Sequence, residues 1–259
     1  MASRLWRMSR HAPRGAVFPG AIVLLWWAAT SSGFLHGPLV VTPQQVAAVP
    51  FKDASGSALW SSLGASVARV VSGGLFGGLL GLALGYMAGL YRVAALGLSP
   101  TIHSIRQVAL FAWIPLLTAW FGNGEVTKFV FTALSAFFPL FLAAEQGVRQ
   151  VPRSLVEVAH VTGLTYRTRL RKLYLPAALP SVNVGIQIAV LSAWIGTIGS
   201  EYAIGNGRGL GSYIASARDQ FRMDIVIVGV LALAAGSVLL NSLVGALTQK
   251  LSPWTQDVK

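Results

Sequence analysis

The sequence predicts an all-α integral membrane protein with six transmembrane helices. Of its 259 residues, 54% are hydrophobic and only 11% are charged, whereas soluble domains carry about 25% charged residues. The mean hydropathy is +0.63. Six apolar windows lie between the charged residues, most of them near the roughly 20 residues that a spanning helix needs. These windows are residues 17–35, 70–91, 107–122, 129–144, 179–200 and 225–249.

The first window follows a basic segment, as in a secretory signal peptide. We expect it to be retained as a transmembrane helix, because the apolar stretch runs on and no clean small-residue cleavage site follows. Residues 1–16 form a basic cytoplasmic tail, and residues 36–66 an external segment whose prolines interrupt any long helix. A transmembrane core would then cover residues 67–250, with a basic loop at 149–178 and a short cytoplasmic tail at 251–259.

The second window contains five glycines in steps of four residues. Small residues at this spacing let two helix backbones approach closely in lipid. The track indicates packing against another helix of the chain, or else a sliding or dimer surface used in gating. Its members are Gly73, Gly77, Gly81, Gly85 and Gly89.

The third and fourth windows each contain a proline, Pro115 and Pro139. Neighbouring helices can satisfy the carbonyls that a proline leaves free, so both windows remain candidate spans.

The net charge of +12 is explained by topology and not by nucleic-acid binding, for which no basic face with aromatic platforms is visible. A cytoplasmic N-terminus puts thirteen Lys and Arg residues inside and six outside, with Arg106 ambiguous at a helix end, as the positive-inside rule requires. The six outside residues are Lys52, Arg69, Lys128, Arg208, Arg218 and Arg222.

The basic loop predicts two short helices separated by a glycine turn. Ser154 and Glu157 have the spacing of a capping box that starts the first helix. Gly163 suits the left-handed position that ends it. Thr165 can cap a second helix, which we expect to end at Leu173 because Pro176 restricts the residue before it.

The first of these helices carries a small apolar face, made of Leu155, Val158, Ala159 and Thr162. Such a face can lie in a groove of a protein partner. It can equally rest on anionic lipid headgroups, which the four cations of the second helix would attract. Spacing alone leaves both interpretations open.

The loop resembles the "EAA" loop of permease subunits of bacterial ATP-binding cassette importers. It reads Glu157-Val158-Ala159, three residues, Gly163, nine residues, Leu173, one residue, and Leu175-Pro176. The family form is Glu-Ala-Ala, Gly, Ile and Leu-Pro at the same spacing, so only Val158 and Leu173 depart from it. Residues 114–116, 120–125, 137–139 and 209–211 resemble the sulfonate, taurine and nitrate subgroup.

This resemblance implies a type I importer permease fold in the bacterial inner membrane, with a cytoplasmic coupling helix between helices 4 and 5. It implies two copies of the chain, two cytoplasmic ATPase subunits that bind ATP and magnesium, and an extracytoplasmic binding protein. The chain itself has no phosphate-binding loop of the G-x-x-x-x-G-K-[ST] type. We therefore expect no enzymatic activity and no cofactor in this chain.

Polar residues at membrane depth are candidates for a transport pathway. They are Arg106, Gln107, Asn183, Gln187 and Glu201. Each could instead form an interhelical contact or lie at a helix end. The histidines lack metal-ligand spacing, and the chain has no cysteine.

The leading hypothesis is an importer of aliphatic sulfonate, taurine or a similar small anion. Nitrate or a heterocyclic vitamin precursor is the alternative substrate, and a channel or ion-coupled transporter without an ATPase is the alternative function.

Overall fold

The computed structural model describes residues 12–33, 37 and 39–251, and every regular element in that part of the chain is helical. The predicted N-terminal tail ends too late, because residues 12–16 already belong to the first helix. The rest of that tail, and the C-terminal tail apart from residue 251, lie outside the described residues. The α-helices are α2 (Ala12–Ser31), α3 (Pro43–Ala48), α4 (Asp53–Leu90), α5 (Arg92–Ile105), α6 (Ile114–Phe121), α7 (Glu125–Arg149), α8 (Arg153–Val161), α9 (Tyr166–Arg169), α10 (Leu175–Ile204), α11 (Leu210–Asp219) and α12 (Met223–Leu251). Two 3₁₀ turns, η1 (Val49–Phe51) and η2 (Leu110–Trp113), and one π-helical turn, η3 (Leu170–Tyr174), connect them.

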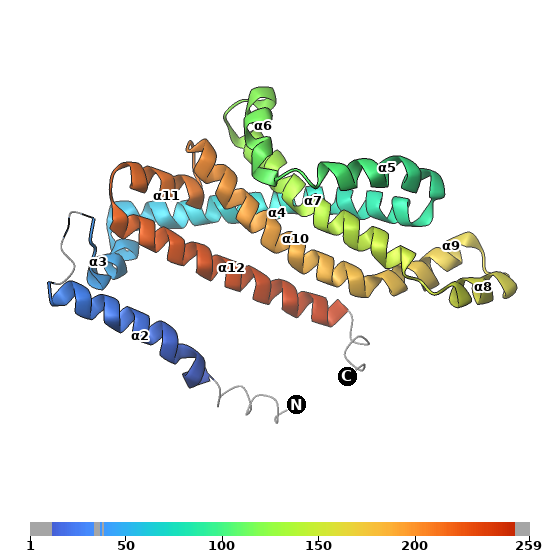
Figure 1. Cartoon of the computed structure of the whole chain (residues 1–259), viewed down its shortest axis with the longest axis horizontal. Coiled ribbons are helices and arrows are strands. Elements are labelled where there is room, and N and C mark those ends of the chain that lie inside the picture. The colour runs from blue at the N-terminus through green and yellow to red at the C-terminus, as the bar shows by residue number, and fades with distance from the viewer. Residues whose placement is uncertain (1–11, 34–36, 38, 252–259) are drawn as a thin grey trace.

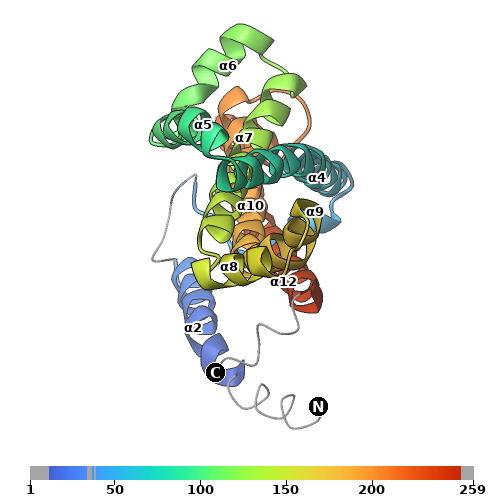
Figure 2. The same ribbon diagram turned by 90° about the vertical axis from the view of Figure 1, so that its right-hand side faces the viewer.

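The long helices α4, α7, α10 and α12 run lengthwise beside one another (Figure 1). Helices α3 and α11 lie at one end of this bundle, here called the α11 end, and α8 and α9 project from the other, the α8 end. Helix α2 stands apart from the long helices in both views (Figure 2). Its Trp26 indole N–H donates to the Val41 carbonyl near α3, at 3.1 Å.

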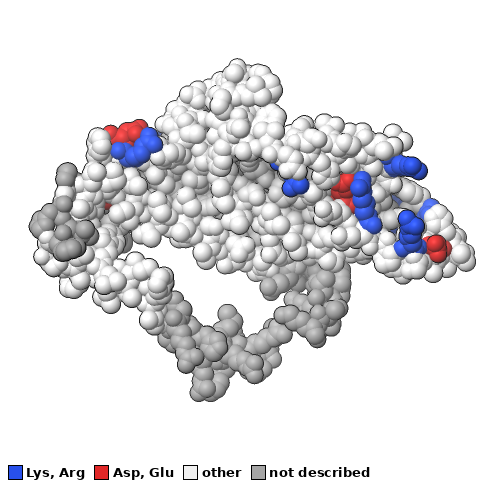
Figure 3. Space-filling view, viewed as in Figure 1, with Lys and Arg blue, Asp and Glu red and all other residues white. Residues whose placement is uncertain are grey.

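Charged side chains on the visible face gather toward the two ends, and the broad stretch between them is nearly free of charge (Figure 3). Four helices of the described chain are long and apolar enough to cross a membrane: Ala54–Leu90, Glu125–Arg149, Tyr166–Ile204 and Met223–Thr248. A multi-pass membrane protein follows from both observations.

The third predicted window, residues 107–122, does not form a straight helix of its own. It is the second arm of a bent pair, in which Arg92–Ile105 and Leu110–Phe121 meet at 93°. Arg106 and Gln107 lie in the break between them. The apolar part of α2, Val17–Ser31, is shorter than the four long helices.

The second long helix also begins earlier than the apolar window indicates. Helix α4 starts at Asp53, inside the segment expected to be external, and Arg69 does not end it. That arginine is buried and has two carboxylate partners, so its charge is compatible with an uninterrupted helix.

The glycine track of α4 lies against the backbone of α7. A Cβ atom added to Gly77 would lie 1.9 Å from the Ala133 carbonyl oxygen, and one added to Gly85 would lie 2.3 Å from the Phe141 carbonyl oxygen. Only a residue without a side chain permits this approach. The two helices therefore form a closely packed pair within one chain.

The apolar core lies where α10 meets α7 and α12. Trp194 is fully buried there, and its indole N–H donates to the Leu233 carbonyl of α12 at 3.2 Å. Between α7 and α10 the Thr132 and Thr197 hydroxyls are hydrogen-bonded at 2.8 Å. Polar groups in the bundle thus find partners on neighbouring helices, as membrane packing requires.

Candidate functional site

Helix α8 begins one residue before the predicted capping box. Pro152 occupies the N-cap position, with φ −57° and ψ 133°, and no side chain caps the helix. Ser154 therefore lies inside the first turn, where it cannot act as the N-cap. The predicted pairing of Ser154 with Glu157 is wrong, because the backbone leaves the extended conformation at Pro152 and Ser154 is already inside the helix.

The end of α8 is as the sequence predicts. Gly163 has φ +67°, and its N–H donates to the His160 carbonyl at 3.0 Å, while the Leu164 N–H donates to the Ala159 carbonyl at 3.2 Å. These two bonds are the Schellman pattern that closes a helix with a left-handed residue. The turn gives α8 a fixed direction relative to the chain that follows.

The second helix starts as predicted but does not end at Leu173. The Thr165 hydroxyl accepts a hydrogen bond from the Thr168 N–H at 3.4 Å, and α9 then continues through the π-helical turn η3 into α10. Pro176 lies directly after the π-helical turn, and a local π adjustment can satisfy the carbonyls that its missing N–H leaves free. The prediction of an end at Leu173 is wrong, and the hairpin is joined directly to a membrane-crossing helix.

The expected apolar face of α8 is divided between the inside and the outside of the chain. Ala159 is buried, with 4% of its surface exposed, whereas Leu155 is 48% and Val158 59% exposed. Thr162 is exposed, and its hydroxyl donates to the Val158 carbonyl of its own helix at 2.8 Å. The exposed part is thus centred on Leu155 and Val158.

The remaining residues of the motif lie around the hairpin. Glu157 and Leu175 are exposed, and Leu173 and Pro176 are half-buried. The Arg169 guanidinium contacts the His160 ring, which joins α9 to α8. The rings of Tyr91 and Tyr166 lie 6.3 Å apart and connect the end of α4 to the start of α9.

A cavity of about 680 Å³ lies beside the break between α5 and α6, against α7 and α10. Arg106 and Gln107 both line it, together with apolar side chains such as Phe138 and Val184. The other polar lining residues are Ser135, Gln146, Ser181 and Ser192. An exposed guanidinium in such a setting can bind an anion.

The remaining candidate pathway residues do not line this cavity. Gln187 is exposed and Asn183 is half-buried, both on α10. Glu201 is fully buried at the α11 end. The structure therefore brings together only Arg106 and Gln107 of the five residues that the sequence indicates.

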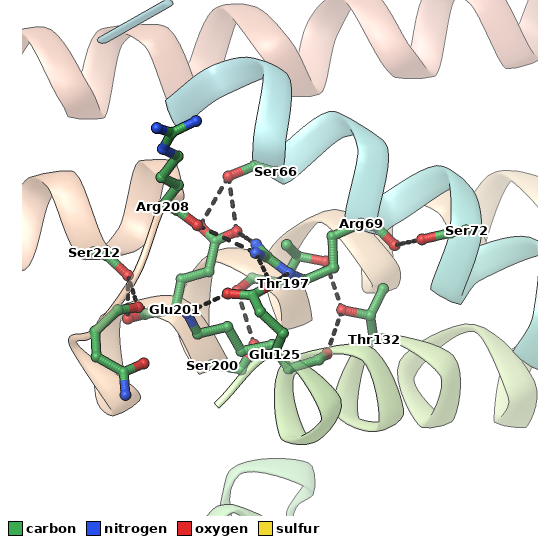
Figure 4. Close-up of polar contacts among 12 residues, drawn as sticks. Ser66, Arg69, Ser72, Glu125, Thr132, Thr197, Ser200, Glu201, Arg208 and Ser212 are labelled. Atoms are coloured by element: carbon green, nitrogen blue, oxygen red, sulfur yellow. Dashed lines mark hydrogen bonds and ion pairs between the residues drawn. The ribbon is translucent and has the colours of Figure 1, made fainter. Parts of the chain in front are cut away.

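Glu201 lies at the centre of a polar cluster (Figure 4). Its carboxylate accepts the Ser66 hydroxyl at 2.8 Å, the Gly211 N–H at 2.9 Å and the Arg69 guanidinium. The Ser66 hydroxyl oxygen in turn accepts the Leu210 N–H at 2.8 Å. Glu201 thereby binds two free amides at the start of α11, directly and through Ser66, as helix N-termini require.

A second carboxylate and a lysine extend this cluster toward α7. Arg69 also pairs with Glu125, and the fully buried Lys128 ammonium group lies 3.1 Å from Glu125. Lys128 donates to the Asn206 carbonyl as well. From the sequence, Arg69 and Lys128 were predicted only to be external charges. Each lies next to an apolar window, so the local sequence does not indicate its distant partners.

Another buried carboxylate joins α7 to α5. Glu145 accepts the Ser99 hydroxyl at 2.6 Å and lies 2.7 Å from Arg149 and 3.0 Å from the His103 ring. This cluster holds α5 immediately before the break that carries Arg106. In the sequence, Glu145 directly follows the apolar window 129–144, so it was not predicted to have a buried partner.

Tyr213 of α11 joins the same end of the bundle to α4. Its hydroxyl donates to the Ser55 carbonyl at 3.2 Å. Burial raises the pKa of the Tyr213 hydroxyl, so it remains a protonated donor at neutral pH.

Long apolar helices around a cavity that contains a few polar side chains, with a helical hairpin projecting at one end, define a multi-pass membrane protein. The chain belongs to the family described as "Binding-protein-dependent transport system inner membrane component", whose model matches residues 77–253. In this family the permease is separate from the subunit that hydrolyses ATP. The family predicted from the loop is thus confirmed.

Curated relatives agree with this assignment over nearly the whole chain. The aliphatic sulfonates transport permease protein SsuC of Bacillus subtilis is 33% identical, covering 93% of this chain and 87% of its own. The taurine transport system permease protein TauC of Escherichia coli is 29% identical over 98% and 94%. The riboflavin transport system permease protein RibX of Chloroflexus aurantiacus is 31% identical over 90% and 87%.

Among solved structures, a chain of the MetNI methionine ABC transporter in an inward-facing conformation is similar, with a TM-score of 0.59 and 20% identity. The match covers 75% of this chain and 98% of that one. At this identity the likeness concerns the fold alone.

Proposed function

We propose that this chain is the transmembrane permease of an ATP-driven importer for a small anion such as an aliphatic sulfonate or taurine. It moves the solute by alternating access and takes its driving motion from a cytoplasmic ATPase that grips α8. The observation that carries the proposal is the exposed apolar face of α8, centred on Leu155 and Val158 and held by the turn at Gly163.

Six membrane crossings are consistent with the arrangement of the helices. The crossings that we propose are α2, α4, the bent pair α5–α6, α7, α10 and α12. With six crossings, the segments before α2 and after α12 belong to the same side of the membrane. The α8 end carries the basic residues Arg92, Arg149, Arg153, Arg167, Arg169, Arg171 and Lys172, so the positive-inside rule makes it the cytoplasmic end.

Docking of α8 on a protein partner is better supported than contact of α8 with lipid headgroups. In the described chain, Leu155 and Val158 protrude from the end of the bundle beside the exposed carboxylate of Glu157. The Glu157 carboxylate can pair with a cation on a protein, and the family of this chain works with a separate ATPase subunit, for which α8 is the exposed contact that we propose. Two ATPase subunits, one for each permease copy, are the partners that we propose.

A second copy of the chain would complete the transport pathway. The cavity that holds Arg106 is open beside a stripe of exposed apolar residues on α10, namely Val184, Ile188, Leu191 and Ile195. Their spacing puts them on one helix face. We propose that this face meets its own copy, with Gln187 beside it and lipid around the remaining apolar surface.

An anionic substrate is consistent with the residues of the cavity and with the substrates for which the relatives are named. Arg106 supplies a cation to the cavity, and sulfonate and carboxylate oxygens are good acceptors for a guanidinium. The sulfonate and taurine permeases among the relatives carry such anions by name. An extracytoplasmic binding protein would deliver the substrate at the α11 end.

The test is uptake of radiolabelled taurine into proteoliposomes that contain the permease with its ATPase and binding protein. ATP-dependent uptake is expected for the native chain. It should be lost in Gly163→Val, since a β-branched residue at φ +67° is strained, while membrane insertion persists. Undiminished uptake by the variant, or flux driven by an ion gradient without an ATPase, would contradict the proposal.

A further inference from the structure

The cluster at the α11 end contains four charged residues, which we call the charge node: Arg69, Glu125, Lys128 and Glu201. Lys128 and Glu201 are fully buried, Arg69 is 8% exposed, and the Glu125 side chain is 63% exposed. The node contains two cations and two carboxylates. Its formal charges therefore cancel, which is the condition for keeping ionised groups in an apolar surrounding.

The node joins three of the long helices at this end. Arg69 lies on α4, Glu125 on α7 and Glu201 on α10 (Figure 4). Lys128 also lies on α7. The cations of the node also bind the connection between α10 and α11. Arg69 donates to the Arg208 carbonyl at 3.1 Å, and Lys128 donates to the Asn206 carbonyl.

The connection between α10 and α11 packs tightly against the Glu201 carboxylate. Gly209 has φ +158°, and a Cβ atom on it would lie 2.4 Å from the Glu201 carboxyl carbon. The carboxylate also accepts the Gly211 N–H and, through Ser66, holds the Leu210 N–H. Lifting α11 from α4 would break these bonds together and leave buried charges without partners, which is costly in a low-dielectric environment.

We propose that the charge node is a static clamp that keeps α4, α7, α10 and α11 together as one rigid body throughout transport. Glu201 is its central positioning residue. Access at this end would then change between the two copies and at the bent pair α5–α6, and not by movement of α11 away from its own bundle. This inference rests on the proposed transport cycle.

A cysteine pair can test the clamp directly, because the native chain contains no cysteine. The Asn206 side-chain amide donates to the Asn123 carbonyl, and both residues are exposed. Asn123→Cys with Asn206→Cys therefore places two thiols across the contact between the α10–α11 connection and the start of α7. Each single substitution serves as a matched control.

The measurement is cross-linking of the assembled permease and ATPase, without nucleotide and after trapping with ATP and vanadate. Mild oxidation gives the disulfide, and a short bismaleimide gives a cross-link that does not depend on disulfide geometry. We expect equal yields in both states, and full ATP hydrolysis by the cross-linked complex. A yield that falls in one state, or hydrolysis lost on oxidation and regained on reduction, would overturn the clamp.

The clamp and the proposed function fail in different ways. A permease that never associates with an ATPase would contradict the proposed function, whereas ready cross-linking of the permease alone would still support the clamp. No cross-linking of the permease alone, by either reagent, would contradict the clamp in a protein that otherwise transports.

Discussion

Arg69 of α4 and Glu201 of α10 form a buried ion pair, although 132 residues separate them in the sequence. Each has further partners: Arg69 binds Glu125 and the Arg208 carbonyl, and Glu201 binds Ser66 and the Gly211 N–H. The pair therefore connects the two long helices that flank α7. It also fixes the start of α11.

Replacing Glu201 with glutamine should destabilise the folded permease. The substitution leaves Arg69 buried with only the partly exposed Glu125 as a counter-charge, and removal of one partner of a buried pair costs roughly 3–5 kcal/mol. The thermal unfolding midpoint in detergent should fall by roughly 2–4 °C per kcal/mol for a chain of this size.

Asp219→Asn is the matched control for this prediction. Its carboxylate pairs with Arg218, and both side chains are exposed, at 67% and 52%, so the pair is expected to contribute only about 0–1 kcal/mol. Equal shifts of the midpoint in the two variants would mean that burial of Glu201 is not what stabilises this end.

Alanine in place of Gly77 should force α4 and α7 apart. The added Cβ would lie 1.9 Å from the Ala133 carbonyl oxygen, and overpacking of this kind costs typically about 1–3 kcal/mol. Gly64→Ala, on the same helix with nothing within 4 Å, should be neutral or stabilise by roughly 0.5–1 kcal/mol. Thermal unfolding of the two variants side by side is the measurement, and the opposite order would contradict close packing of α4 on α7.

Arg106→Gln should weaken transport of an anion without weakening the fold. The side chain is exposed in the cavity, and a charge-assisted hydrogen bond contributes about 1.5–3 kcal/mol. The KM for taurine uptake should therefore rise on the order of ten- to a hundredfold, with the unfolding midpoint unchanged. Arg92→Gln, an exposed cation outside the cavity, is the control, and an equal loss in both variants would exclude a specific role for Arg106.

Apolar content and spacing in the sequence predicted most of the long helices and the glycine turn at Gly163. They could not predict the charge node, because Arg69 and Lys128 find their partners on segments far away in the sequence. In a count of charges both look like residues that flank a membrane span. The bend between α5 and α6 was not predicted either, because the apolar content of residues 107–122 does not show the direction in which that segment runs relative to α5.

The predictions for the basic loop were correct where they depended on local sequence and wrong elsewhere. Gly163 and Thr165 act through their own backbone and nearest neighbours, so their roles follow from local sequence. Ser154 was predicted to cap α8, but Pro152, two residues earlier, occupies the N-cap position. The π-helical turn η3 carries the chain past the predicted end at Leu173, which a rule for the residue before proline does not foresee.

If a soluble ATPase binds the exposed face of α8, a charge placed in that face should release it. The measurement is co-purification of the ATPase with the Val158→Asp permease. Val158 is 59% exposed, so the substitution should leave the permease folded while a buried, unpaired carboxylate disrupts the contact. Val93→Asp, at an 84% exposed position on α5, is the matched control. We expect the native chain and Val93→Asp to retain the ATPase and Val158→Asp to lose it. Full retention of the ATPase by Val158→Asp would show that the ATPase does not bind this face of α8.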